Sequence, residues 1–303
     1  MSAGLLCPGQ GAQTVGMGVS WTQQSPAAAE VFRRCSEALG FDLLELCAAG
    51  PAERLVRTDV CQPAILATSA ACLAALEEQG RVDRGRCSVA LGLSLGEYTA
   101  LYAAGVLELE DAVRLVRLRG SAMQEASDDP PSGMTSLVGA DRETAQEVCD
   151  EATASGGVCV VANLNAPGQV VISGDREALA RAEAAATAHG IRRTIRLEVA
   201  GAFHSPLMEP ARARLEQAID DTPFKPARFP VIANATAEPA SDVDTLRKNL
   251  VRQLTAPVLF ESSLRRALAD GVESFFELSP GRVLCGLVKK ISRKFPVESG
   301  TEA

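Results

Sequence analysis

Short apolar runs alternate with Ala- and Leu-rich stretches along most of the chain, and the two patterns predict different elements. The apolar runs predict strands at residues 4–7, 87–91, 229–233 and 274–278. Apolar positions at helical spacing predict helices, notably at residues 62–78, 96–104 and 111–126. Strands that alternate with helices are typical of an α/β fold with a largely parallel sheet.

The middle of the chain has a different order of elements, which begins after the Asp-Asp-Pro-Pro breaker at 128–131. The patterns predict strands at 134–138, 158–163, 169–173 and 193–199, and helices at 142–154 and 176–188. This βαββαβ order is the ferredoxin-like unit. We therefore predict that residues 128–198 form a small domain inserted into a larger α/β domain made of residues 1–127 and 199–303. The polar residues from Glu298 onward are expected to fray.

The sharpest local motif is Gly-Leu-Ser-Leu-Gly at residues 92–96, between a predicted strand and a predicted helix. A G-x-S-x-G sequence in this context is typical of a nucleophile elbow, in which the serine projects from a sharp turn. Ser94 is then a candidate nucleophile, and the backbone N–H of Leu95 faces a developing oxyanion. The alternative is an ordinary strand-to-helix turn in which Ser94 only caps the helix.

A glycine-rich loop, Pro-Gly-Gln-Gly-Ala-Gln at residues 8–13, follows the first predicted strand. It lacks the third glycine of a dinucleotide-binding fingerprint and the Lys of a P-loop. We interpret it as a second source of backbone N–H groups for an acyl oxygen.

The chain has only two histidines, so a base for Ser94 has two candidates. His189 ends a predicted helix and precedes Gly190, which a structural role explains completely. His204 lies in a loop between a predicted strand and a helix, where neither packing nor capping explains an imidazole. We therefore expect His204 to be the base.

Arg119 stands out on the predicted helix at 111–126, because helical spacing places it within the apolar stripe. A buried guanidinium needs a partner, and its planar fork fits a carboxylate. The partner is either an internal Asp or Glu or a carboxylated substrate. Together with an elbow serine and a loop histidine, Arg119 implies an acyl group that bears a free carboxylate.

Composition and charge exclude several classes of function. The 303 residues include 38 acidic and 30 basic ones, and the net charge of −8 predicts no binding to nucleic acid or to an anionic membrane. We expect no membrane-spanning segment and no signal peptide. The nine cysteines include no C-x-x-C pair and indicate reduced thiols in a cytoplasmic protein. With two histidines, no histidine-rich metal site is expected.

Several of these motifs, in the same order along the chain, resemble the malonyl-CoA:acyl carrier protein transacylase family. The resemblance extends from about Gly4 to Val288. The motifs lie at residues 9–13, 92–98, 119–120, 163–169, 172–174, 201–205 and 251–254. The family has an α/β-hydrolase-like domain interrupted by a ferredoxin-like one, so the resemblance implies this architecture here.

The resemblance also implies roles for the catalytic residues. Ser94 is expected to be the nucleophile and His204 its base, oriented by the backbone carbonyl of Gln253 instead of an acidic residue. The backbone N–H groups of Gln10 and Leu95 are expected to form the oxyanion hole.

For the substrate, the resemblance implies that Arg119 holds the malonyl carboxylate and that Gln62, Asn165 and Phe203 line the pocket. Phe203 is similar to the residue of malonyl-selective members, in which a bulky ring disfavours an α-methyl branch. One departure is Leu93, where the family usually has a histidine that is not the base. This departure affects the expected shape and hydrogen bonding of the pocket behind Ser94.

The expected reaction is ping-pong transfer of malonyl from malonyl-CoA to the phosphopantetheine thiol of acyl carrier protein, without a cofactor and by a monomer. The sequence does not distinguish fatty-acid from polyketide synthesis. An acidic carrier protein needs a basic surface, and two clusters are candidates: residues 192, 193 and 196, or residues 289, 290, 293 and 294. The rival functions are an ordinary serine hydrolase and a catalytically silent subunit of a synthase.

Overall fold

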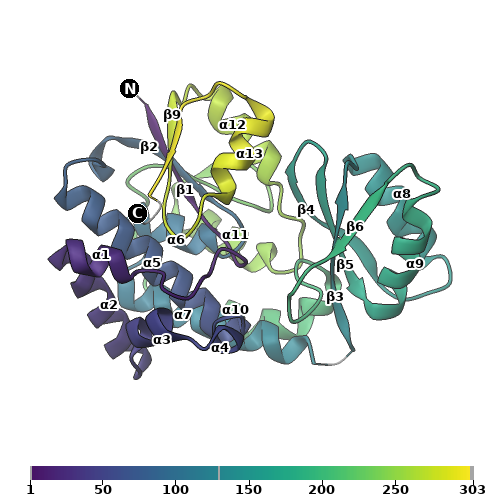
Figure 1. Cartoon of the computed structure of the whole chain (residues 1–303), viewed down its shortest axis with the longest axis horizontal. Helices are drawn as coiled ribbons and strands as arrows, with labels where there is room; N and C mark the ends of the chain where they lie inside the picture. Colours follow the sequence, from purple (N-terminus) through teal and green to yellow (C-terminus); the bar gives the residue numbers. More distant parts are fainter. Residues whose placement is uncertain (1, 129, 301–303) are drawn as a thin grey trace.

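The computed structural model describes residues 2–128 and 130–300 and contains two β-sheets (Figure 1). The larger part of the molecule holds a six-stranded sheet in the order β10-β9-β1-β2-β7-β8. Its strands are β1 (Ala3–Cys7), β2 (Cys87–Gly92), β7 (Val231–Ile232), β8 (Pro239–Ala240), β9 (Ser274–Glu277) and β10 (Val297–Ser299). All pairs are parallel except that of β7 with β8.

The register of the two central strands positions the functional loops. Cys7 at the end of β1 lies opposite Gly92 at the end of β2. Because parallel strands that end together place their following loops at one sheet edge, the glycine-rich loop and the turn at Ser94 lie side by side.

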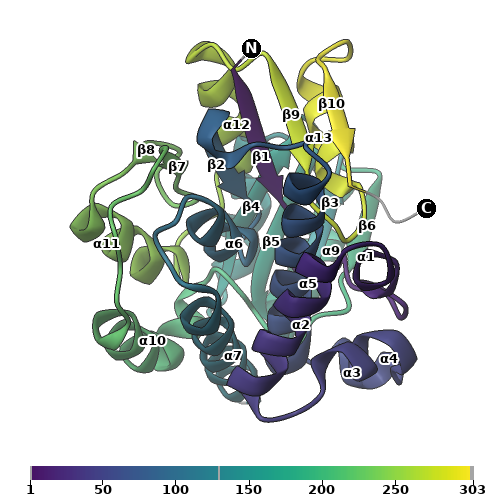
Figure 2. The ribbon, with the colours of Figure 1, turned by 90° about the vertical axis from the view of Figure 1, so that its left-hand side faces the viewer.

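Helices flank this sheet, and α2, α5 and α7 pack against one another on one side of it (Figure 2). Local signals start several of them: α2 follows the cap Ser25, whose hydroxyl accepts a hydrogen bond from Ala28 N, and has Pro26 at its first position. The α-helices of this part are α1 (Val19–Gln24), α2 (Pro26–Leu39), α3 (Leu43–Ala49), α4 (Ala52–Leu55), α5 (Thr58–Glu78), α6 (Gly96–Ala103), α7 (Leu109–Ala126), α10 (Glu209–Asp221), α11 (Val243–Gln253), α12 (Phe260–Ala269) and α13 (Val283–Ile291). Short 3₁₀ turns occupy Arg84–Arg86 and Pro206–Met208.

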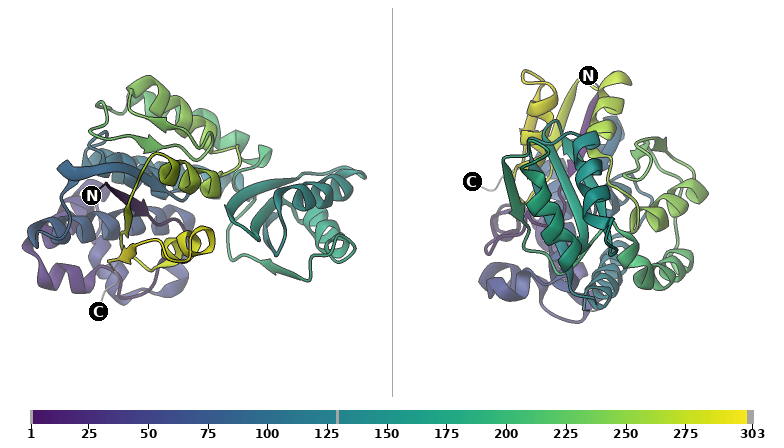
Figure 3. Two further views of the ribbon diagram at one scale, coloured as in Figure 1. Left: turned by 90° about the horizontal axis from the view of Figure 1, so that it is seen from above. Right: turned by 90° about the vertical axis from the view of Figure 1, so that its right-hand side faces the viewer.

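The smaller part is the predicted ferredoxin-like unit. Its sheet has the order β4-β5-β3-β6 with every pair antiparallel. The elements are β3 (Ser132–Val138), α8 (Arg142–Thr153), β4 (Cys159–Ala166), β5 (Gln169–Asp175), α9 (Arg176–Ala186) and β6 (Arg193–Arg196). Both helices cover the outer face of the sheet, and the other face is turned toward the larger part (Figures 1 and 3).

The predicted α/β fold with an inserted ferredoxin-like unit is confirmed, and the larger part has the α/β-hydrolase-like arrangement. The small part has a hydrophobic core of its own, from Leu137 to Ile191. The exact domain limits at 128 and 198 stay a prediction, and residue 129 lies outside the described residues. The end of the chain differs from expectation, because residues 297–299 pair with β9 as strand β10.

One helix has the length and apolar composition of a membrane span. Helix α5 has 21 residues and a mean hydropathy of 1.4 over its most apolar 18-residue window, enough by length and composition to cross a membrane. However, 89% of that window is buried inside the protein. Core helices of globular proteins can have the same length and composition, and α5 is such a helix, because it packs against α2 and α7.

The nine cysteines pack as small hydrophobic residues and none forms a disulfide. Eight are buried, and Cys87 is half-buried. Burial raises the pKa of the Cys35 and Cys61 thiols to about 12, so these groups stay protonated.

Candidate active site

Ser94 lies in the turn between β2 and α6 with a left-handed backbone, at φ 53°. This conformation is costly for a residue with a side chain and concentrates at functional sites. The flanking glycines make the turn possible: a Cβ on Gly92 would lie 2.0 Å from the carbonyl carbon of Gly96, and one on Gly96 would lie 2.0 Å from the carbonyl oxygen of Cys7. The turn is therefore pressed against β1, as a nucleophile elbow requires.

Ser94 and His204 are in hydrogen-bond contact, as the sequence predicts. Ser94 Oγ lies 2.7 Å from His204 Nε2, and His204 Nδ1 lies 2.8 Å from the backbone oxygen of Gln253. Because a carbonyl oxygen only accepts, Nδ1 carries the proton and Nε2 is the acceptor for the Ser94 hydroxyl. His204 also has a left-handed backbone, at φ 58°. The hydrogen bond to Gln253 therefore orients the ring, and the surrounding structure maintains the strained backbone.

The environment of His204 keeps it neutral. His204 is 3% exposed. Burial, followed by the positive charge of Arg119, lowers the pKa of His204 to about 4. At neutral pH the imidazole is therefore unprotonated and able to take the Ser94 proton.

Arg119 lies on α7, is 1% exposed, and points at the serine. Its Nη1 donates to Gln62 Oε1 at 2.8 Å, and its Nη2 donates to Gln253 Oε1 and to Ser94 Oγ, both at 3.1 Å. Among the described residues, no carboxylate forms an ion pair with Arg119, and its Nε has no hydrogen-bond partner. The internal-partner alternative is thus not seen, and the guanidinium is available to an anion placed beside Ser94.

Two polar residues near the elbow have no role in the sequence predictions. Asn234 Oδ1 accepts from Ser94 N at 2.7 Å, and Asn234 Nδ2 donates to the carbonyl of Gly92 at 2.7 Å. Glu97 Oε2 accepts from Asn234 N at 2.9 Å and from Gln253 Nε2 at 2.7 Å. Asn234 follows β7, the neighbour of β2, so its position at the shared edge of parallel strands is the signal that could have found it.

Two residues with free backbone N–H groups, Gln10 and Leu95, line the cavity beside Ser94. Neither Gln10 N nor Leu95 N donates a hydrogen bond to any described residue, although Leu95 is fully buried. The next amide in the loop, Gly11 N, is occupied by Gln13 Oε1 at 2.7 Å. Orphan amides of this kind can stabilise an oxyanion.

The site opens into a cavity of ≈ 150 Å³ between the two parts of the molecule. Asn165 and Phe203 line it as predicted, and Leu93 forms part of its wall beside Ser94. Gln62 differs from prediction: it lies fully buried behind Arg119 and not on the cavity wall. The remaining lining residues are Gln10, Leu95, Arg119, Met123, Met134, Asn163, Val171, Leu197, Val199 and His204.

This arrangement suits transfer of an acyl group that carries an anion. A serine beside a neutral imidazole can attack a carbonyl carbon, two amides can hold the oxyanion, and a guanidinium can hold a carboxylate. The group that orients His204 is a backbone carbonyl, whereas the Ser-His-Asp hydrolases use a carboxylate there.

Comparisons with known proteins agree with this chemistry. The acyl transferase domain model matches residues 5–301. The malonyl CoA-acyl carrier protein transacylase of Bacillus subtilis is 42% identical over 289 residues, which are 95% of this chain and 90% of that protein. The transacylase of Escherichia coli K12 is 42% identical over 285 residues, covering 94% and 91%. The chain belongs to the malonyl-CoA:acyl carrier protein transacylase family.

Solved structures of this transacylase family share the whole fold. The acyl-carrier-protein S-malonyltransferase of Bartonella henselae superimposes with a TM-score of 0.96 at 36% identity, over 100% of this chain and 96% of that chain. A malonyl-transacylase in complex with a type II PKS acyl-carrier protein gives a TM-score of 0.93 at 36% identity, over 100% and 96%. The likeness therefore includes the inserted unit, because each match covers the full length of this chain.

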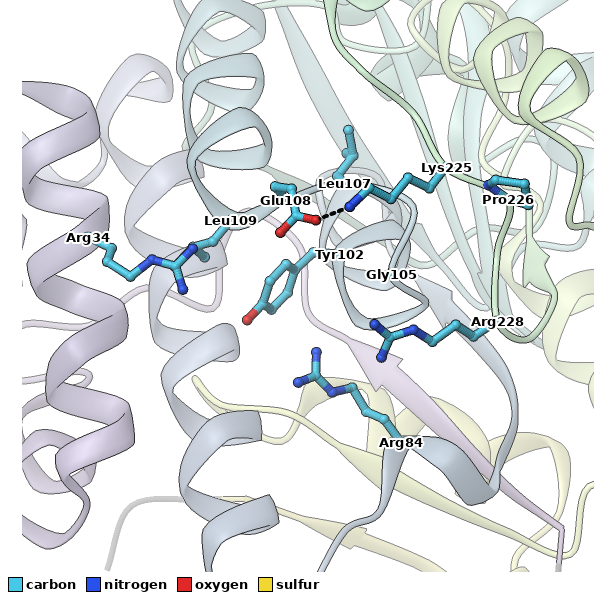
Figure 4. A pocket seen from close by; sticks show the side chains of 10 residues that line it. All are labelled: Arg34, Arg84, Tyr102, Gly105, Leu107, Glu108, Leu109, Lys225, Pro226 and Arg228. Carbon is cyan, nitrogen blue, oxygen red and sulfur yellow. Dashed lines mark hydrogen bonds and ion pairs between the residues drawn. The ribbon is translucent and has the colours of Figure 1, made fainter.

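A larger hollow of ≈ 330 Å³ lies elsewhere on this transacylase-family chain and is lined by four basic side chains (Figure 4). Three of them already form ion pairs, so little positive charge is left for a ligand. These pairs are Arg34 with Glu110, Arg84 with Glu77, and Lys225 with Glu108. Arg84 precedes β2 and Ser94 follows it, so the hollow lies at the opposite edge of the sheet.

His189 is remote from the site, as the sequence predicts. It lies after α9 in the small part and forms ion-pair contacts with Glu147 at 3.3 Å and Glu151 at 2.8 Å. The hydrogen bond with Glu151 raises the pKa of His189, opposite to the shift of His204. Within residues 2–128 and 130–300, no group of three or more His, Cys, Asp or Glu side chains is placed to hold a metal ion.

Proposed function

We propose that the chain transfers a malonyl group from malonyl-CoA to the phosphopantetheine thiol of acyl carrier protein. The observation that carries this proposal is the guanidinium of Arg119, whose Nη2 lies 3.1 Å from Ser94 Oγ beside a serine–histidine pair. This places a carboxylate-binding group within the length of one short acyl chain from the nucleophile. The names of the relatives point to the same donor and acceptor.

In the first half-reaction, His204 Nε2 takes the Ser94 hydroxyl proton while Ser94 Oγ bonds to the thioester carbonyl carbon. The oxyanion lies against Gln10 N and Leu95 N. When the carbonyl re-forms, the carbon–sulfur bond breaks, the proton on His204 passes to the CoA sulfur, and a malonyl ester remains on Ser94.

In the second half-reaction, the carrier thiol replaces CoA. His204 takes the thiol proton, the sulfur attacks the ester carbonyl, and Ser94 leaves with that proton. Arg119 holds the same carboxylate before, during and after the transfer. Each proton and charge has a residue of this chain to receive it, so we propose a reaction that uses no cofactor and a site that one monomer completes. We also propose that the protein acts in the cytoplasm.

Phe203 supports malonyl as the preferred acyl group. Its ring is 5% exposed and forms part of the cavity wall. A branch on the α-carbon of the acyl group needs space that this ring occupies, so we propose that Phe203 disfavours methylmalonyl.

For the acidic carrier protein we propose the basic surface at the end of α13. Lys289 and Lys290 lie in its last turn and are exposed. The rival cluster is partly neutralised, because Arg196 binds Glu183 through two hydrogen bonds. The residues of the proposed surface are Lys289, Lys290, Arg293 and Lys294. The start of α13 lies near the glycine-rich loop of the site. A Cβ on Gly281, two residues before α13, would lie 3.8 Å from the Cβ of Ala12 in that loop.

Charge reversal tests this surface. Lys289→Glu with Lys290→Glu should slow malonyl loading of the carrier protein and weaken its dependence on salt, while malonyl-CoA loading of Ser94 stays normal. The matched control is Arg192→Glu with Arg193→Glu, which should change neither. The opposite ranking would assign docking to the small part.

Trapping of the acyl-enzyme tests the function itself. After mixing with malonyl-CoA, intact-mass measurement should show an added mass of about 86 Da that peptide mapping places on Ser94 and that carrier protein removes. Acetyl-CoA and methylmalonyl-CoA should label less. Rapid release of malonate to water without a thiol would instead support a hydrolase, and no adduct at all would support a silent subunit.

A further inference from the structure

Glu97 is a buried acid that the proposed reaction does not use. It lies in the first turn of α6, three residues after Ser94, and is 2% exposed. Burial raises the pKa of Glu97 to about 7, while hydrogen bonds from Asn234 N and the Gln253 amide and the charge of Arg119 act in the other direction. Burial of a carboxyl group costs free energy, and such groups are concentrated at functional sites.

The side-chain amide of Gln253 lies between Glu97 and Arg119. Gln253 Nε2 donates to Glu97 Oε2 at 2.7 Å and to the Ser94 carbonyl at 2.9 Å. On its other side, Gln253 Oε1 accepts from Arg119 Nη2 at 3.1 Å. Only acceptors face the amide nitrogen and a donor faces the amide oxygen, so this orientation satisfies every partner.

We propose that Glu97 is a positioning residue, which fixes the Gln253 amide so that its oxygen holds Arg119 in place for the carboxylate of the substrate. The inference rests on the proposed function of Arg119. Glu97 itself touches neither Arg119 nor the cavity; it acts through Gln253.

Selectivity is what distinguishes this role from a structural one. Without an acceptor at Glu97, the Gln253 amide nitrogen loses its shortest hydrogen bond and keeps only the Ser94 carbonyl at 2.9 Å and Asn234 Oδ1 at 3.4 Å, so the orientation of the amide is less fixed. Arg119 then loses one of its fixed contacts. A malonyl group depends on Arg119 and an acetyl group does not, so malonyl transfer should suffer more.

The experiment compares Glu97→Leu with Glu97→Gln. We expect Glu97→Leu to lower kcat/KM for acylation of Ser94 by malonyl-CoA roughly tenfold more than for acetyl-CoA. Glu97→Gln keeps an oxygen acceptor and should restore the ratio to near the wild-type value. Thr99→Val, a buried change on the same helix, controls for disturbance of α6 and should leave the ratio unchanged. Thermal unfolding of each variant confirms that it is folded.

A double variant tests whether the effect passes through Gln253. If Glu97 acts by orienting Gln253, adding Glu97→Leu to Gln253→Leu should lower the malonyl-to-acetyl ratio no further. Equal losses for both substrates in Glu97→Leu, or multiplicative effects in the double variant, would overturn the inference. Failure of the wild-type protein to form a malonyl ester would overturn the proposed function instead, so the two failures are distinguishable.

Discussion

The two walls of the cavity differ in chemistry. The wall from the larger part carries Ser94, His204 and Arg119, joined by hydrogen bonds of 2.7 to 3.1 Å. The wall from the small part is mostly apolar, with Met134 and Val171 from its sheet. Its Asn165 has a buried side-chain oxygen without a partner among the described residues.

This difference separates the groups that react and bind the carboxylate from the surface that shapes the rest of the acyl pocket. Acyl transfer needs groups fixed to a fraction of an ångström, which hydrogen bonds between residues on rigid elements provide. Recognition of an acyl chain needs only a surface of the right shape. Two backbone hydrogen bonds join the two walls. Leu164 N donates to the Val258 carbonyl at 2.9 Å, and Val258 N donates to the Ala162 carbonyl at 2.8 Å.

The largest effect is expected where the hydrogen-bonded wall loses its base. His204→Ala should lower the rate of Ser94 acylation by about 10² to 10⁴-fold, because no described group replaces the imidazole. Rapid-quench measurement with malonyl-CoA gives the rate. His189→Ala is the matched control and should retain the wild-type rate; similar losses in both variants would contradict the assignment of the base.

Loss of the carboxylate-binding group should separate two substrates. Arg119→Ala should lower kcat/KM for malonyl-CoA about 100-fold relative to acetyl-CoA, since a paired charge-assisted contact is lost only for malonyl. Arg114→Ala, an exposed change on the same helix, should leave the ratio unchanged. An equal loss on both substrates would remove the carboxylate-binding role of Arg119.

The aromatic side chain next to the base should influence selection more than rate. Phe203→Ala should raise acylation by methylmalonyl-CoA relative to malonyl-CoA by roughly tenfold, because space for one methyl group is worth about this much. Competition between the two thioesters, read as ester masses on Ser94, measures the ratio. Phe224→Ala, a half-buried change outside the cavity, serves as control. An unchanged ratio would show that another residue excludes the branch.

Local patterns in the sequence were sufficient for the fold and for the reacting groups. The breaker and the βαββαβ order predicted the inserted unit, and helical spacing alone placed Arg119 among buried positions, as observed. His204 was separable from His189 because a loop histidine lacks the structural reasons that explain a helix end. Chain order predicts none of the contacts between these residues, which depend on where the strands end.

The hydrogen bonds behind Ser94 could not be predicted from the sequence, because they join residues far apart along the chain. Asn234 and Glu97 are ordinary in their local patterns, and their meaning depends on contacts with residues 137 to 156 positions away. Gln62 shows the same limit. The pattern places it at the start of a predicted helix, but whether it faces the cavity or Arg119 depends on the packing of α5 against α7.

The smallest effect is expected from pH, and it tests whether burial controls the reactive wall. With the pKa of His204 lowered to about 4, the base stays unprotonated at pH 5.5, so its contribution to kcat/KM for acylation should change less than about twofold between pH 7.5 and 5.5. A histidine of ordinary pKa near 6.5 would lose about tenfold over the same range. Glu97 titrates within this window because burial raises its pKa to about 7, so the profile should be measured in Glu97→Gln as well. A tenfold fall in that variant would mean that burial does not lower the pKa of His204, and the contrast between the buried site and the rest of the molecule would not hold.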